Sequence, residues 1–122
     1  MTDQRVIIEM GMGNDQYGMD YTKAAARAIE DAIRHSALPI FAALDLSTDA
    51  MRVAVTIGVA EPDKVDTAHL ATLLPRGRAS VRAVPGGLNV TNPGAGTTIV
   101  IATAAIEAHV APQTGWRLRE PA

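Results

Sequence analysis

A chain of 122 residues with a formal net charge of −2 is long enough for one domain with its own apolar core and too short for two. This charge balance lacks the basic surface that general nucleic-acid binding requires, and the absence of cysteine excludes disulfides, thiol nucleophiles and thiolate metal sites. No segment reaches the ~20 apolar residues of a membrane helix and the first ten residues are unlike a signal peptide, so we expect a cytoplasmic protein that binds neither nucleic acid nor membrane.

The first third of the chain predicts a strand, a loop and a helix. Residues 5–10 (RVIIEM) are apolar and β-branched at adjacent positions, which is typical of a central strand covered on both faces. Residues 11–18 (GMGNDQYG) follow as a glycine-rich loop. Within residues 21–38 the Ala and Ile side chains form one stripe and the charged side chains another, which predicts an amphipathic helix with Asp20 or Thr22 as its N-cap.

The rest of the chain predicts further strands and one short helix. Apolar residues alternate over 51–59, which indicates a strand with one covered face, and residues 66–74 follow as a helix capped by Asp66. Residues 78–84 and 88–90 flank the turn sequence PGG and predict a hairpin, and residues 97–110 predict the last strand. Residues 41–50 are compatible with a short helix or an irregular link, and residues 111–122 form a polar tail.

This order of elements predicts a single α+β domain over residues 1–122. We expect a mixed or mostly antiparallel sheet of four or five strands with two helices packed on one face. Only 3% of the residues are aromatic, so the core must consist mainly of aliphatic side chains. The uncovered face of the sheet needs a partner, and we expect a homo-oligomer that packs sheet against sheet or edge against edge.

The glycine-rich loop carries most of the functional information. Its glycine spacing does not fit a dinucleotide fingerprint. It does not fit a phosphate loop either, because Met19 and Asp20 stand where a phosphate loop has lysine and a hydroxyl residue. A glycine-rich turn before a helix still exposes backbone N–H groups at the positive end of the helix dipole, which favours an anion. The alternative is that Asp15 and Asp20 accept hydrogen bonds from these same N–H groups and cap the loop.

An acid/base site at this loop has definite candidate residues. Glu9 and Asp15 could act as acid or base, Lys23 would lower their pKa values, and His35 could join only if the fold or a neighbouring subunit brings it close. A hard cation could use Glu9, Asp15 and Asp20 as oxygen ligands, but their spacing matches no calcium-loop pattern, so we expect no metal, and we expect no cofactor. The predicted ligand-binding residues are Gly11, Gly13, Tyr17, Gly18 and Asp20.

The motif of residues 11–18 also resembles the motif of a known protein family. It resembles the hallmark G-x-G-x-D-x-H-G of a family of conserved hypothetical proteins named after a Listeria open reading frame, with Tyr17 where the family pattern has histidine. The similarity takes in Asp20, Thr22 and Lys23, and extends more loosely through the PGGL sequence to about Val110. It implies membership of that family but no defined activity, and any chemistry of the motif histidine does not carry over to Tyr17.

Three hypotheses about function follow. The first is a cytoplasmic homo-oligomer with a small-molecule site at the loop, performing hydrolase-like or lyase-like acid/base chemistry on a polar metabolite. The second is a non-catalytic module in which the loop binds an anionic ligand or a protein partner. The third is purely structural, with glycines that only shape a tight connection between strand and helix.

Overall fold

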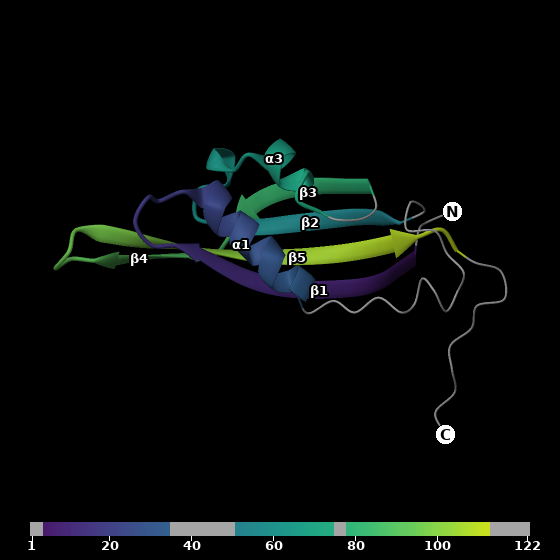
Figure 1. The fold of residues 1–122 in the computed structure, drawn as a ribbon, viewed down its shortest axis with the longest axis horizontal. Coiled ribbons are helices and arrows are strands. Elements are labelled where there is room, and N and C mark those ends of the chain that lie inside the picture. The colour runs from purple at the N-terminus through teal and green to yellow at the C-terminus, as the bar shows by residue number, and fades with distance from the viewer. Residues whose placement is uncertain (1–3, 35–50, 75–77, 113–122) are drawn as a thin grey trace, which may run out of the picture.

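A computed structural model of the chain describes residues 4–34, 51–74 and 78–112, and these residues form one open sheet with helices beside it (Figure 1). The strands are β1 (Gln4–Asp15), β2 (Arg52–Val59), β3 (Arg78–Pro85), β4 (Leu88–Asn92) and β5 (Thr97–Val110). The helices are α1 (Tyr21–Arg34) and α3 (Thr67–Ala71), with a 3-10 turn η2 (Pro62–Lys64) before α3. Among the described residues, no helix is long and apolar enough to cross a bilayer.

The sheet is mixed and mostly antiparallel, in the order β1-β5-β2-β3, and β4 also pairs with β5. β5 runs antiparallel to β1, β2 and β4, whereas β2 and β3 are parallel. The predicted α+β fold is therefore confirmed. The long β5 has two neighbours along one edge, because β2 pairs with its second half and β4 with its first. The arm formed by β4 and the first half of β5 extends beyond the ends of β2 and β3 (Figure 1).

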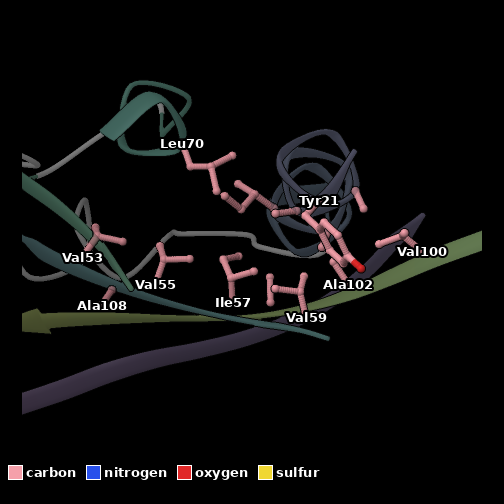
Figure 2. Packing of buried hydrophobic residues seen from close by; sticks show 14 of the residues in the cluster. Tyr21, Val53, Val55, Ile57, Val59, Leu70, Val100, Ala102 and Ala108 are labelled. Atoms are coloured by element: carbon pink, nitrogen blue, oxygen red, sulfur yellow. The ribbon is translucent and has the colours of Figure 1, made fainter. Parts of the chain in front are cut away.

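The apolar core lies between the sheet and the helices. Alternate residues of β2, namely Val53, Val55, Ile57 and Val59, point toward the helices and are almost fully buried (Figure 2). The helices supply the opposite wall through the side chains of Tyr21, Ala24, Ala25, Ala28, Ile29 and Leu70. Because α1 contributes mostly alanines, its backbone can lie close to the sheet.

The first strand differs from the prediction in position and in length. We predicted a central strand over residues 5–10, but β1 lies at one end of the sheet order and continues to Asp15. Its alternate side chains Ile8, Met10 and Met12 are exposed on the face away from α1. The adjacent apolar residues therefore indicate a strand with one uncovered face, not one buried on both faces.

The glycine-rich segment is likewise mostly strand. Residues 11–15 belong to β1, and only the residues after Asp15 leave the sheet to reach α1. A Cβ at Gly11 would lie 2.4 Å from the carbonyl oxygen of Ala28, and a Cβ at Gly13 would lie 2.4 Å from the backbone nitrogen of Ala28. These two glycines let the helix backbone contact the strand directly, so the predicted loop over residues 11–18 is corrected to a short connection.

The predicted hairpin between residues 78–84 and 88–90 is wrong. β3 pairs with β2 in parallel, β4 pairs with β5, and residues 85–87 carry the chain across the end of β2. There the N–H of Gly86 donates to the carbonyl of Val59 at 2.9 Å, and Gly87 has a φ of +62°. The PGG sequence therefore makes a corner between strands, and the hairpin turn lies instead between β4 and β5, where the N–H of Gly96 donates to the carbonyl of Asn92 at 2.9 Å.

Both predicted helices are present. α1 starts at Tyr21 as predicted, and its expected end near residue 38, together with residues 41–50, lies outside the described residues. α3 is shorter than the predicted 66–74, and the side chain of Asp66 accepts the N–H of His69 as its cap.

Candidate functional site

Asp15 anchors the connection between β1 and α1. It is the last residue of β1, points to the helix side of the sheet and is 5% exposed. Its Oδ2 accepts the N–H of Asp20 at 2.9 Å and the N–H of Gly18 at 3.1 Å. A Cβ at Gly18 would lie 3.1 Å from this same oxygen, so glycine allows the connection to close around the carboxylate.

Two cations of α1 face the other oxygen of this carboxylate. Lys23 Nζ lies 3.7 Å and Arg27 Nη1 lies 4.0 Å from Asp15 Oδ1, and Arg27 Nη1 also donates to the carbonyl of Asn14 at 2.6 Å. Both cationic side chains are about half exposed. We call Asp15, Lys23 and Arg27 the Asp15 cluster.

The electrostatics of the Asp15 cluster keep Asp15 ionised. The hydrogen bond from the Asp20 amide lowers the pKa of Asp15 below its ordinary value of 3.8. The Gly18 amide and the charges of Lys23 and Arg27 act in the same direction, and burial opposes them without reversing the pKa shift. Asp15 is therefore a charged acceptor at neutral pH and a poor proton donor.

Asp20 begins α1 as one of the two predicted caps. Its Oδ1 accepts the N–H of Lys23 at 3.0 Å, which satisfies one of the free N–H groups of the first turn. Thr22 instead accepts the N–H of Asp66 at 2.9 Å and links the starts of α1 and α3. Met19, just before the cap, has a φ of +49°, a conformation that costs a non-glycine residue about 1 kcal/mol or more.

A second polar group surrounds Tyr21, on the neighbouring side of the α1 start. The Tyr21 hydroxyl donates to Glu61 Oε2 at 2.8 Å and accepts from Asn89 Nδ2 at 2.8 Å, and Lys64 Nζ lies 3.3 Å from the same Glu61 oxygen. The hydrogen bond from Tyr21, followed by that from Lys64, lowers the pKa of Glu61. We call Tyr21, Glu61, Lys64 and Asn89 the Tyr21 cluster.

The register of the sheet places the two clusters side by side. Val100 of β5 pairs with Asp15 on one side and with Asn89 on the other. Since neighbouring strands are about 4.8 Å apart, the Cα atoms of Asp15 and Asn89 lie roughly 10 Å apart. Asn89 Oδ1 is buried and accepts no hydrogen bond within the described part of the chain, so this region holds an acceptor without a donor.

The sequence-predicted site residues are only partly brought together. Asp15, Gly18, Asp20 and Lys23 meet at the start of α1. Glu9 lies on the same face of β1 but six residues before Asp15, which at about 3.3 Å per residue separates them by roughly 20 Å.

The four other predicted residues do not join this group. Gly11 and Gly13 lie under α1, so they do not offer their backbone to a ligand on that face. The side chain of Tyr17 is 83% exposed beside the connection. His35 lies outside the described residues.

The Tyr21 cluster was missed by sequence reasoning. Tyr21 is 40 residues from Glu61 and 68 residues from Asn89, and no local spacing connects them. The one usable signal was the position of Glu61 two residues after a strand that ends at Val59, because residues in loops that follow strands often carry function.

Removing the Tyr21 hydroxyl should loosen this cluster. In Tyr21→Phe, Asn89 Nδ2 loses its acceptor and Glu61 loses the hydrogen bond that contributes most to its lowered pKa. We expect a melting temperature lower by a few degrees and a raised pKa for Glu61 in an NMR titration of its carboxyl group. Tyr17→Phe is the matched control, because this exposed hydroxyl should affect neither quantity; equal effects of the two variants would contradict the assignment.

Comparisons with known proteins agree with this fold. Residues 5–108 match the model of a family described as Conserved hypothetical protein (Lin0512_fam). A crystal structure described as that of an FtsZ-like protein of unknown function from Nostoc punctiforme is 34% identical in sequence, with a TM-score of 0.82 over 92% of this chain and 99% of that one. No curated protein matches the chain. Neither description assigns an activity.

Proposed function

This chain belongs to the Lin0512 family of conserved hypothetical proteins, and we propose that it is a homo-oligomer that binds a small anionic metabolite at the start of α1. The binding groups are the side chains of Lys23 and Arg27, with the exposed hydroxyl of Tyr17 nearby in the chain. The proposal concerns a binding function in the cytoplasm, the compartment that we expect from the sequence.

The observation that carries the proposal is the pair of half-exposed cations in the Asp15 cluster. Lys23 and Arg27 both lie near Asp15 at the N-terminal end of a helix, where the carboxylates of Asp15 and the capping Asp20 balance their charges. The helix dipole adds to the attraction for an anion at this end. Lys23 lies 3.7 Å from Asp15, longer than a hydrogen bond, so its ammonium group has donors available for a phosphate or carboxylate.

The protonation state of two carboxylates, those of Asp15 and Glu61, favours binding over hydrolase-like or lyase-like acid/base chemistry. Asp15 is occupied by two amides, and the pKa values of Asp15 and Glu61 are both lowered, so both are poor proton donors at neutral pH. Glu9, the other predicted acid or base, lies roughly 20 Å away along β1. The purely structural hypothesis accounts for Gly11 and Gly13 and for the amides that Asp15 and Asp20 accept, but it gives no role to the half-exposed cationic groups of Lys23 and Arg27.

Calorimetry with inorganic phosphate, succinate and citrate at low ionic strength tests the proposal. We expect saturable binding of at least one anion to the wild-type protein, and a loss of about tenfold or more in affinity in Lys23→Ala and in Arg27→Ala, since each removes a charge-assisted hydrogen bond. Arg34→Ala is the matched control, because Arg34 is an exposed arginine in the last turn of the same helix.

Two results would overturn the binding proposal. One is the absence of saturable heat with all three anions. The other is an equal loss of affinity in Arg34→Ala, which would mean that the anions respond only to overall charge. Products formed from any anion that binds would assign an enzymatic activity to the same residues.

The homo-oligomer is supported by the face of the sheet opposite the helices. Large apolar side chains on this face are exposed to solvent in the single chain: Ile8, Met10, Met12, Leu88 and Val90. Several large exposed apolar side chains on one face are typical of a protein contact. Light scattering at micromolar concentration should give a mass of at least two chains.

A further inference from the structure

We infer that the open face of the sheet, formed by the outward side chains of β1, β5, β2, β3 and β4, is the contact between two copies of this chain. The inference rests on the proposed homo-oligomer and names the surface that it uses. Its exposed apolar residues come from the two strands that flank β5, with Met10 71% exposed on β1 and Leu88 58% exposed on β4.

Strand register shows that these exposed residues form one surface. Leu88 pairs with Ile101 and Val90 pairs with Ile99, so the arm presents these side chains on the same face of the sheet. Ile101 in turn pairs with Asn14 of β1, two residues after Met12. Ile101 therefore lies diagonal to Met12 and connects the apolar residues of β1 with those of β4, beside the polar Asn14.

The shape of this face is complementary to the same face of a second copy. Ile8, Met10 and Met12 form a ridge along β1. In the rows of Met10 and Met12 the next two strands carry small residues, whereas the row of Ile8 carries Glu107 on β5. In one row Met10 is followed by Ala105 and Thr56, and in the next Met12 is followed by Thr103 and Gly58.

A dimer with two-fold symmetry could use this complementary shape directly. The methionine ridge of one copy can lie in the trough of small residues of the other, and the reverse contact follows by symmetry. The far side of the trough is closed by Arg82, whose Nε donates to Thr56 Oγ1 at 3.1 Å. Methionine suits such a contact because its flexible, polarizable side chain adapts to the opposing surface.

The size of the face fits a stable contact. At about 3.3 Å per residue along the strands and about 4.8 Å between strands, the sheet face covers roughly 700 Å². A standard protein interface buries about 800 Å² on each partner. A second copy placed face to face can therefore bury the area that a specific dimer needs.

The alternative of edge-to-edge pairing through β1 is obstructed. Asp31 Oδ2 of α1 accepts the N–H of Met12 at 2.9 Å, and Arg27 Nη1 donates to the carbonyl of Asn14 at 2.6 Å. These backbone groups lie on the outer edge of β1 and would otherwise be free to pair with another strand. Helix side chains thus protect this half of the β1 edge from pairing with another strand.

The absence of native cysteine allows a direct crosslinking test. We expect Met12→Cys and Thr103→Cys, both on the open face, to give covalent dimers with a short bis-maleimide. Leu73→Cys is the matched control, since Leu73 is an exposed apolar residue that follows α3 in the helix layer, and it should remain uncrosslinked.

Charge substitutions give a second, independent readout. Met10→Lys and Met12→Lys should weaken self-association at least tenfold in analytical ultracentrifugation while circular dichroism stays unchanged, and Leu73→Lys should leave association unchanged. An oligomer that survives both methionine substitutions, and that crosslinks at Leu73→Cys but not on the face, would overturn the inference and leave the homo-oligomer standing. A wild-type monomer at micromolar concentration would overturn both.

Discussion

Gly13→Ala is expected to destabilise the protein by about 3 kcal/mol, which should lower the melting temperature by roughly 10 °C or more. A Cβ at this position would lie 2.4 Å from the backbone nitrogen of Ala28, 2.5 Å from the carbonyl oxygen of Ala24 and 2.6 Å from the Cβ of Arg27. Two of these atoms belong to the helix backbone, so α1 as a whole would have to move away from β1.

A matched control for Gly13→Ala is Gly94→Ala, in the turn between β4 and β5. There the only neighbour of a new Cβ would be Asn92 Oδ1 at an ordinary distance of 3.5 Å, and the stability should change little. Urea denaturation of the two variants measures the difference. Equal stability of Gly13→Ala and the wild-type protein would show that α1 does not contact β1 as described.

Asp15→Asn is expected to cost about 2–3 kcal/mol of stability at neutral pH, because both amide hydrogen bonds lose a charged acceptor. The effect should depend on pH. The folded-state pKa of Asp15 is lowered, so its contribution is fully present above the ordinary value of 3.8 and is lost as the pH falls through the lower folded-state value. The stability gap between wild type and variant should therefore shrink in strong acid.

Urea denaturation at neutral pH and at about pH 3 and below measures this gap. Asp63→Asn makes the same change of charge at an exposed position of η2 and should show neither a large cost nor this acid dependence. A gap that stays constant down to the lowest pH would mean that the charge of Asp15 does not support the fold.

The elements that sequence patterns predicted well are those whose signals are local. The stripe of alanine and isoleucine in α1 and the alternation in β2 depend on residues a few positions apart, and both elements start within one residue of the expected position. The wrong hairpin has the opposite cause. Pro85, Gly86 and Gly87 specify a sharp change of direction, but the pairing partner of β3 is decided by the distant β2.

The glycines of the first strand show a different ambiguity. Glycine between short polar residues is typical of a loop, and glycine under a close helix is typical of a packed strand. The distinction depends on Ala24 and Ala28, whose small side chains let α1 approach β1. The alanine stripe was visible in the sequence, but its partner strand was not.

The candidate site likewise contains some residues that the sequence could identify and others that it could not. Asp15, Asp20 and Lys23 lie within nine residues of one another, so capping rules and charge spacing could find them. Arg27 is one of several charged side chains on the polar stripe of the helix, and nothing local distinguishes it from the others. The Tyr21 cluster depends on contacts between α1, the residues after β2 and β4, which only the folded chain brings together.

An NMR titration of the isotope-labelled protein with inorganic phosphate tests the central claim most directly, because it shows where the anion binds. We predict saturable shifts of backbone amide signals at residues 17–23 and of the side-chain signals of Lys23 and Arg27, all abolished in Lys23→Ala. Shifts confined to other surfaces, or no saturation in the wild-type protein, would contradict the claim that the start of α1 is an anion site.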